Sequence, residues 1–327
     1  MTLRIAIAGI SHWHAPRYLE ALERHRATLV GVSDHDAAFA RTRGQDLSCP
    51  AFADTHAMLG ATRPDFAIVL PRHDLARVEI EAVADRRVAA LVEKPMGLDA
   101  ADAAAAAAAM ERAGVFAASC LPNRYLSFWE AIDRLRGAGK LGRPVHASFR
   151  IINGPPQRYR DYGVPWMLDP AISGGGALRN LGSHGADAAF ALADGELAVR
   201  GALIANRAHG LAIEDFAAAT VASADGFEAT LEVGYSFAAP AGGDQEWRLA
   251  ATGAYVIDAN GTLTITTADG ETSSTPSRRA ADVYRMMLDD AIERFTAGRK
   301  PVATLGECAR AVGLLDAIYR AGRAAPP

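Results

Sequence analysis

The stretch Val88-Ala89-Ala90-Leu91-Val92-Glu93-Lys94-Pro95 decides how the first part of this chain folds. Its five apolar residues are typical of a strand that is buried on both faces of a parallel sheet. Such sheets bind ligands at their carboxyl edge, so Glu93 and Lys94 would lie there, with Pro95 keeping Lys94 extended. A buried lysine is rare unless it is functional, which makes Lys94 a candidate site residue; the alternative is a surface lysine before a turn.

Four more short apolar runs share this pattern, at residues 3–8, 28–32, 65–70 and 115–120. Segments that begin near Pro16, Ala37, Leu75 and Asp99 separate the runs and predict helices. Alternating strands and helices are typical of a parallel sheet built from βαβ units. We therefore predict a first domain of residues 1–122 that contains this parallel sheet.

Residues 123–327 show a different pattern, from which we predict a second domain. After a helix at 123–136, strands are expected at 145–152, 216–222, 227–236, 247–252, 255–258 and 262–267, with loops at 153–165, 238–244 and 273–278. Asp225-Gly226, Asn260-Gly261 and Asp269-Gly270 favour tight antiparallel turns, and further helices are expected at 180–192, 280–297 and 305–321. The predicted fold class is therefore α/β: a parallel-sheet domain followed by an α+β domain with a large, mostly antiparallel open sheet.

The composition favours a soluble protein that binds small molecules. The 327 residues are 50% hydrophobic, carry a net charge of −4 and contain no basic run, which argues against nucleic acid or an anionic membrane as partner. Cys49, Cys120 and Cys308 lie far apart without CxxC spacing, which indicates neither a disulfide framework nor a zinc site and fits a reducing, cytoplasmic location. The amino terminus shows no signal-peptide pattern, and no apolar run reaches membrane-spanning length.

The residues Gly9-Ile10-Ser11-His12-Trp13-His14 lie where a dinucleotide-binding turn is expected. Only the first glycine of the GxGxxG pattern is present; Ser11 offers a hydroxyl to a phosphate in place of the second glycine, and His14 replaces the third. Asp34 follows the next strand and would accept hydrogen bonds from the adenosine ribose, which favours NAD over NADP because a 2′-phosphate would be repelled. Asp34 or Asp36 could instead cap the next helix. The pair His12 and His14 does not indicate a metal, because no acid or cysteine lies at ligand spacing.

A glycine-rich run, Ser173-Gly174-Gly175-Gly176, opens a helix that carries Asn180 and His184. The i, i+4 spacing places both side chains on one face of the helix. His184 could take a hydroxyl proton as hydride leaves the same carbon, because its usual pKa is near neutrality, and Asn180 could orient it or bind substrate. A histidine satisfied in a domain interface is the alternative.

Together these motifs resemble the Gfo/Idh/MocA family, the glucose–fructose oxidoreductase and inositol dehydrogenase group. The resemblance covers nearly the whole chain and is most specific at Glu93-Lys94-Pro95, Asn123-Arg124-Tyr125, residues 166–170 with the run from Gly174, and Glu214-Asp215. It implies an N-terminal Rossmann domain with a tightly held nicotinamide cofactor, and a C-terminal domain whose open sheet is used in oligomer contacts. Sugars, inositols or related polyols would be the substrates.

The resemblance also implies roles for individual residues. Lys94 would contact substrate and nicotinamide, and His184 would act as acid or base. The family has aspartate where this chain has Asn180, so a charge that would stabilise protonated His184 is absent. Arg72 departs from the family's usual asparagine and could take a cofactor or substrate contact. The expected catalytic residues are Lys94, His184 and Asn180, and the expected cofactor-binding residues are Gly9, Ser11, His12, Asp34, Pro71, Arg72, Glu93 and Lys94.

Substrate contacts are expected from Arg124, Arg158, Tyr159 and Trp166, which combine cations and rings suited to a sugar-like, anionic ligand; a solvated surface loop would have the same composition. We interpret the chain as an NAD(P)-dependent dehydrogenase that acts on a secondary alcohol of a sugar, inositol or related polyol, with NAD as the cofactor. A homodimer or homotetramer is expected. Two alternatives stay open: a glycoside hydrolase or oxidoisomerase that uses NAD without net redox change, and a non-catalytic nucleotide- or sugar-binding protein.

Overall fold

The computed structural model describes residues 2–25 and 27–324, which form two compact units. Within the described residues, unit 1 contains the chain up to Leu121, Tyr159–Gly174 and Tyr284–Arg310. Unit 2 contains Pro122–Arg158, Gly175–Val283 and the residues from Ala311 onward. Unit 1 thus includes two segments from beyond residue 122. The predicted domain boundary between residues 122 and 123 stays a prediction.

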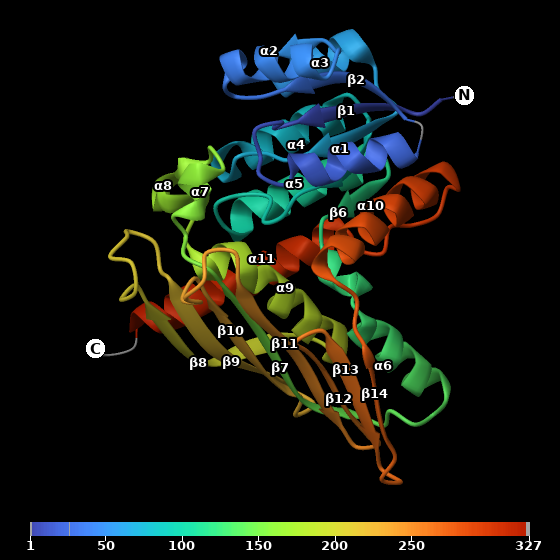
Figure 1. Cartoon of the computed structure of the whole chain (residues 1–327), viewed down its shortest axis with the longest axis vertical. Coiled ribbons are helices and arrows are strands. Elements are labelled where there is room, and N and C mark those ends of the chain that lie inside the picture. Colours follow the sequence, from blue (N-terminus) through green and yellow to red (C-terminus); the bar gives the residue numbers. More distant parts are fainter. Residues whose placement is uncertain (1, 26, 325–327) are drawn as a thin grey trace. The chain divides into compact units, whose positions relative to one another are not determined.

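Unit 1 is built on a six-stranded sheet of order β3-β2-β1-β4-β5-β6 in which every pair of neighbours is parallel (Figure 1). The strands are β1 (Arg4–Ala8), β2 (Thr28–Ser33), β3 (Ala51–Phe52), β4 (Phe66–Val69), β5 (Ala89–Val92) and β6 (Ala117–Ser119). The helices that connect them are α1 (Ala15–Arg24), α2 (Ala37–Asp46), α3 (Thr55–Thr62), η1 (His73–Leu75), α4 (Ala76–Asp85) and α5 (Ala100–Ala113). The chain runs outward from β1 to β3 and then returns to β4, so the strand order reverses between β1 and β4. Ligands of such sheets bind at the carboxyl ends of the strands beside this reversal.

The central strands of this sheet form the core of unit 1. All four residues of β4 and of β5 are buried, which is the continuous apolar pattern of a strand covered on both faces. The alanine-rich segment forms α5, where Asp99 caps the first turn by accepting a hydrogen bond from the Asp102 amide and Gly114 ends the helix in the left-handed region.

The two later segments of unit 1 are mostly helical. They contain α7 (Arg158–Asp161), η3 (Pro165–Leu168) and α8 (Pro170–Ser173), and residues from α10 (Ala280–Thr296) and α11 (Leu305–Ala324). Thr304 forms an isolated antiparallel bridge with Ala118 of β6. Phe295 packs against Phe66 and Phe116, with ring centroids 5.3 and 5.9 Å away. These contacts fix the segment Tyr284–Arg310 to the Rossmann-like core of unit 1.

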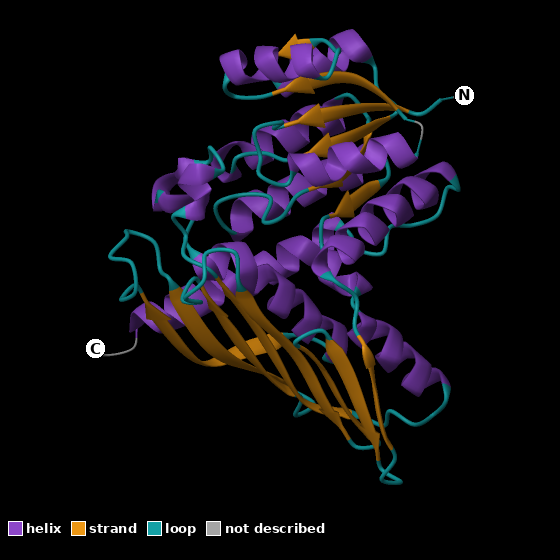
Figure 2. Ribbon diagram, in the orientation of Figure 1, coloured by secondary structure: helices purple, strands orange, loops and turns teal. Residues whose placement is uncertain are grey.

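Unit 2 contains an eight-stranded sheet of order β14-β13-β12-β11-β7-β10-β9-β8 (Figure 2). Its strands are β7 (Pro144–Asn153), β8 (Leu197–Ala205), β9 (Phe216–Ser223), β10 (Glu228–Gly234), β11 (Gly243–Ala251), β12 (Ala254–Ala259), β13 (Thr262–Thr267) and β14 (Thr272–Pro276). Only β7 and β10 pair in parallel; the other neighbours are antiparallel. The unit also contains helices η2 (Pro122–Tyr125), α6 (Ser127–Gly137) and α9 (Ala177–Leu192), the start of α10 and the part of α11 from Ala311 onward; α6 and α9 pack on the sheet. The predicted fold class is confirmed.

Helix α9 lies close to its sheet and is capped from a distant segment. A Cβ at Gly185 would lie 3.3 Å from Leu231 and from Phe149, so glycine permits this close packing. At its N-terminus, Glu214 accepts hydrogen bonds from the Gly176 and Leu178 amides at 2.8 and 2.9 Å. A carboxylate at this end satisfies exposed amides and interacts favourably with the helix dipole. The Glu214-Asp215 motif therefore fixes the start of the helix that carries Asn180 and His184.

Both edge strands of the unit 2 sheet were not predicted from the sequence. Strand β8 contains Arg200-Gly201, where its pairing with β9 shifts register, so its sequence does not alternate regularly. Strand β14 overlaps a segment expected to be a loop, because its residues are small and polar; in the structure all five are exposed. None of the helices in residues 2–25 and 27–324 has the length and apolar character needed to cross a membrane.

Candidate functional site

The carboxyl edge of the unit 1 sheet brings together residues that are distant in the sequence. Strand β1 leads into Gly9, β4 leads to Pro71 and Arg72, and β5 leads into Glu93. Since β4 lies between β1 and β5, these three connections emerge side by side. The sequence-predicted cofactor residues Gly9, Ser11, His12, Asp34, Pro71, Arg72, Glu93 and Lys94 all belong to unit 1.

Gly9 allows the first of these connections to turn tightly. Its φ is +75°, in the left-handed region that favours glycine, and a Cβ at this position would lie 2.0 Å from the carbonyl oxygen of Leu70. The amides of Gly9 and Ile10 both donate to the carbonyl of Ser33, at 2.9 and 3.1 Å. The first glycine of the dinucleotide-binding pattern is therefore required by the backbone itself.

Glu93 and Lys94 are both buried, with 2% and 4% of their surfaces exposed. Burial lowers the pKa of Lys94, and the charge of Glu93 partly offsets this effect. Burial also disfavours the Glu93 carboxylate, but the charge and hydrogen bond of His14 outweigh it and hold the pKa of Glu93 well below its ordinary value. The pair is thus a buried carboxylate beside an amine whose proton is less tightly held than that of an exposed lysine.

Aromatic rings surround the turn that follows β1. Trp13 stacks on the ring of His12 at 3.8 Å, and the rings of Tyr159 and Trp166 lie 5.3 and 6.0 Å from that of Trp13. Trp166 also contacts His73 edge-on at 5.1 Å. Tyr159 and Trp166, which the sequence suggested as substrate contacts, are therefore part of the packing around the turn in unit 1.

Asp34 lies at the end of β2 and uses its carboxylate within the protein. It accepts hydrogen bonds from the amides of Ser11 at 2.7 Å and Asp36 at 3.0 Å, and contacts His35 Nδ1 at 2.9 Å. Burial disfavours its charged form, but the bonds from His35 and the two amides outweigh burial and lower the pKa of Asp34. Asp36, and not Asp34, caps α2, through the amides of Ala38 and Phe39. Asp34 therefore links the turn after β1 to the end of β2, and its bond to a ribose stays a prediction.

Glu79 on α4 lies near Asp34 and predicts a pH-dependent stability. Burial and then the charge of Asp34 raise the pKa of Glu79 to about 7. Because the folded-state pKa exceeds the unfolded one, the stabilisation is fully present below about pH 4.5 and is lost as the pH rises through about 7. We expect Glu79→Gln to remove this part of the pH dependence and to be more stable than the parent by on the order of 2 kcal/mol at about pH 8.5.

Urea unfolding of both proteins at about pH 5 and about pH 8.5 measures this difference, because every other titrating group is shared. Parallel stability curves for Glu79→Gln and the parent would contradict the raised pKa of Glu79. 

In unit 2, Asn180 and His184 lie on α9, with 3% and 7% of their surfaces exposed. Asn180 Nδ2 donates to the hydroxyl oxygen of Tyr235 at 3.0 Å. The guanidinium of Arg158 lies 5.9 Å from the centre of the Tyr235 ring. The predicted residues Asn180 and Arg158 are thus joined through Tyr235 at the end of β10, a residue that sequence reasoning missed because no local motif marks it.

Arg124 forms a two-point ion pair within unit 2. Its Nε and Nη2 donate to the two carboxylate oxygens of Asp187, at 2.9 and 2.6 Å. The side chains of Arg124 and Asp187 are 16% and 7% exposed. The Asn123-Arg124-Tyr125 motif therefore fixes η2 to α9, and a substrate contact by Arg124 stays a prediction.

The residues at the edge of unit 1 fit a nicotinamide dinucleotide. Gly9 makes the required close turn, and two buried polar atoms there, His12 Nε2 and Glu93 Oε1, have no hydrogen-bond partner among the described residues. Buried polar atoms of this kind need a partner, which a ligand can supply. Within residues 2–25 and 27–324, no group of three or more histidine, cysteine, aspartate or glutamate side chains is arranged to hold a metal ion.

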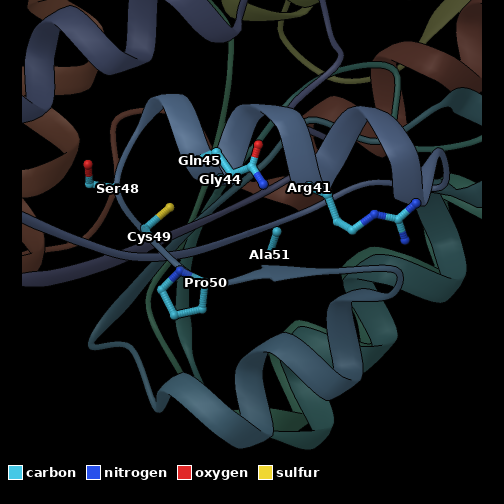
Figure 3. A pocket seen from close by; sticks show the side chains of 7 residues that line it. All are labelled: Arg41, Gly44, Gln45, Ser48, Cys49, Pro50 and Ala51. Carbon is cyan, nitrogen blue, oxygen red and sulfur yellow. The ribbon is translucent and has the colours of Figure 1, made fainter.

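A depression of about 450 Å³ lies elsewhere on unit 1, between α2 and β3 (Figure 3). It is lined by Arg41, Gly44, Gln45, Ser48, Cys49, Pro50 and Ala51. Pro50 directly precedes β3, so the depression lies at the amino end of that strand, whereas the predicted cofactor residues lie at the carboxyl ends. Burial raises the pKa of the Cys49 thiol, which keeps it protonated and unreactive.

Two family models match the chain. Residues 3–119 match the oxidoreductase family with an NAD-binding Rossmann fold, and residues 129–257 match the GFO/IDH/MocA C-terminal domain. D-Apiose dehydrogenase from Paraburkholderia graminis is 30% identical over 158 residues, which are 46% of this chain. The match spans 41% of the length of that relative.

Solved structures with the same fold cover both units. An oxidoreductase from Agrobacterium radiobacter, in complex with NAD⁺, L-tartaric acid and magnesium, has a TM-score of 0.85 and 17% identity over 99% of this chain and 97% of its own. The WlbA dehydrogenase from Bordetella pertussis, in complex with NADH and UDP-GlcNAcA, has a TM-score of 0.82 and 20% identity over 99% and 97%. Aldose–aldose oxidoreductase from Caulobacter crescentus has a TM-score of 0.79 and 21% identity over 99% and 98%.

Proposed function

Because the chain belongs to the Gfo/Idh/MocA family of NAD-binding oxidoreductases, we propose that it is an NAD-dependent dehydrogenase that oxidises a secondary alcohol of a sugar, inositol or related polyol. The observation that carries this proposal is Lys94, a buried lysine at the carboxyl end of β5, beside the buried Glu93 carboxylate. Burying a lysine costs desolvation free energy, which the charge of Glu93 offsets only in part, and ionisable groups perturbed in this way cluster at functional sites.

In the proposed reaction, Lys94 and His184 act on the substrate alcohol. A nicotinamide cofactor held at the carboxyl edge of unit 1 would supply the acceptor for the hydride that leaves the carbinol carbon. Lys94 donates a hydrogen bond to the alcohol oxygen and stabilises the negative charge that develops on it, and His184 takes the hydroxyl proton. The products are a ketone, the reduced cofactor and a proton on His184. Asn180 bonds to Tyr235 and is proposed to orient groups near His184 without supplying the charge of an aspartate.

The cofactor would be held by the carboxyl edge of unit 1. Gly9, Ser11 and His12 belong to the turn after β1, and Pro71 and Arg72 follow β4. Asp34 contributes negative charge near the expected ribose, which supports NAD over NADP. We also propose, from the sequence, that the substrate contacts Arg158, Tyr159, Trp166 and Arg124.

A sugar substrate is supported by the similarity to D-apiose dehydrogenase. D-Apiose is therefore the first compound to test, followed by aldoses, their acids and inositols. Self-association is supported by the large apolar side chains of Leu203 on β8 and Tyr255 on β12, which are 59% and 38% exposed. A homodimer or homotetramer and a cytoplasmic location stay predictions from the sequence.

The test is NADH formation by the purified protein with each compound of this panel. We expect NAD⁺-dependent oxidation of at least one sugar or polyol. Conversion of a sugar without accumulation of NADH would instead favour a hydrolase or oxidoisomerase that uses NAD transiently. Binding of nucleotide or sugar with no conversion of any compound would favour the non-catalytic binding protein.

A further inference from the structure

The turn after β1 binds its own amides within the protein. Ser11 donates its amide to Asp34, His12 donates to the carbonyl of Gly9 at 3.0 Å, and His14 donates to His12 Nδ1 at 3.1 Å. In dinucleotide-binding turns with all three glycines, backbone amides face the ligand. Here most amides of the turn are already engaged, so a ligand at this turn needs side-chain groups as well.

The ring of His12 supplies such a group. A main-chain amide can only donate, so Nδ1 of His12 must be the acceptor of the bond from His14, and the ring proton is on Nε2. Burial, and then the nearby His14, lower the pKa of His12 well below its usual value, so the ring stays neutral. The Nε2–H group is therefore a buried donor, and it has no acceptor among the described residues.

Glu93 supplies an acceptor in the same part of unit 1. Its Oε2 atom accepts from the hydroxyl of Tyr18 at 2.9 Å and from Nδ1 of His14 at 3.3 Å. The hydroxyl oxygen of Tyr18 lies 3.0 Å from the sulfur of Cys120. Burial raises the pKa of both Tyr18 and Cys120, so both stay protonated, and the thiol can donate to Tyr18 while Tyr18 donates to Glu93. The other oxygen of Glu93, Oε1, is buried without a donor among the described residues.

His14 joins the two groups. Its main-chain amide fixes the tautomer of His12, and its ring donates to Glu93. This residue occupies the place of the third glycine of the dinucleotide-binding pattern, where a side chain would ordinarily disturb helix packing. Instead, the imidazole has a specific partner, because its Nδ1 lies 3.3 Å from Oε2 of Glu93, the residue that follows β5.

We propose that His14 is a positioning residue for a donor–acceptor pair, His12 Nε2–H and Glu93 Oε1, and that this pair binds the carboxamide of the nicotinamide ring. A primary amide has a carbonyl oxygen that accepts a hydrogen bond and an amino group that donates one, which is the complement of this pair. The proposal rests on NAD being the cofactor, as in the proposed function. It assigns the carboxamide to His12 and Glu93 while the ribose and diphosphate contact other residues.

Calorimetric titration with three ligands tests the pair without measuring activity. NAD⁺ has the whole carboxamide, 3-acetylpyridine adenine dinucleotide keeps the carbonyl but lacks the amino group, and ADP-ribose lacks the ring altogether. We expect His12→Phe to weaken NAD⁺ and the acetylpyridine analogue alike, by about tenfold, and to leave ADP-ribose unchanged. His14→Ala releases Glu93 and should weaken NAD⁺ severalfold more than the acetylpyridine analogue.

Two further variants serve as controls. His12→Gln keeps an amide donor near the position of Nε2 and should therefore retain most of the NAD⁺ affinity. If residue 12 acted only through packing, this donor would not restore the affinity. His56→Ala removes an exposed histidine of α3 in the same unit and should bind all three ligands like the parent. Unchanged ADP-ribose affinity also shows that each variant is folded.

Three results would overturn the proposal. Equal losses for NAD⁺ and ADP-ribose in His12→Phe would place the contact on the ribose or diphosphate. Unchanged NAD⁺ affinity in His12→Phe would show that the donor is unused, and identical losses for NAD⁺ and the acetylpyridine analogue in His14→Ala would remove Glu93 from the pair. Failure of the parent protein to bind any of the three ligands would instead contradict NAD as cofactor, and so the proposed function itself.

Discussion

Replacing His184 with alanine is expected to lower kcat for NAD⁺-dependent sugar oxidation by roughly 10²- to 10⁴-fold, the usual contribution of a positioned general base. The proton of the alcohol must leave as the hydride does, and His184 is the group proposed to accept it. Lys94→Ala should produce a loss of similar size, because the developing negative charge on oxygen then has no ammonium donor. Initial rates with the substrate identified in the sugar panel measure both effects.

The matched control is His146→Ala, which removes a half-buried histidine of β7 in the same unit as His184 and should leave kcat within about twofold of the parent. NAD⁺ affinity should be retained in His184→Ala, since that residue is not proposed to hold the cofactor. Normal kcat in both His184→Ala and Lys94→Ala would rule out the proposed catalytic roles.

The second large effect is on stability. Arg124→Ala is expected to lower the free energy of unfolding by about 3 to 5 kcal/mol, because it leaves the carboxylate of Asp187 buried without its two-point partner. Chemical unfolding monitored by the fluorescence of the tryptophans measures this loss. Any loss of activity in this variant is expected to follow from the detachment of η2 from α9.

A pair on α6 provides the matched control. Arg136 contacts Asp133 at 3.1 Å, but these side chains are 56% and 72% exposed, so Arg136→Ala should change stability by less than about 1 kcal/mol. Removing both partners in Arg124→Ala/Asp187→Ala should recover part of the stability lost in the single variant. If Arg124→Ala were as stable as Arg136→Ala, the pair with Asp187 would not be the contact that holds η2.

The sequence was sufficient for the fold class and for the family, because both depend on local patterns. Each buried strand of unit 1 reads as a short apolar run, and the parallel topology then places the ends of β1, β4 and β5 at one edge. That is why the sequence predicts residues as distant as Gly9, Arg72 and Lys94 to contribute to one cofactor site.

Elements without an apolar pattern were missed. Strand β14 is polar and exposed at the sheet edge, and β8 is interrupted by a register shift at Arg200-Gly201, so neither resembles an isolated strand. Strand β3 has only two residues. The structure of these segments is determined by pairing with their neighbours, which local sequence does not reveal.

The partners of the site residues could not be predicted, because they are distant in the sequence. His14 looked like a departure from the glycine pattern, yet its ring contacts Glu93, 79 positions away. Glu214 was noted as part of a motif, but its role as the cap of α9 depends on amides 36 and 38 positions away. Such contacts follow from tertiary packing. The one local sign of them was His14, a polar residue at a position that usually requires glycine.

Calorimetric titration of the nucleotide-free protein with NAD⁺, and separately with NADP⁺, tests the central claim most directly. The account predicts that NAD⁺ binds at one site per chain and that NADP⁺ binds at least about tenfold more weakly, because Asp34 and Asp36 repel a 2′-phosphate. Absence of binding by either nucleotide, in a preparation shown to carry none already, would contradict the assignment of this chain as an NAD-dependent dehydrogenase.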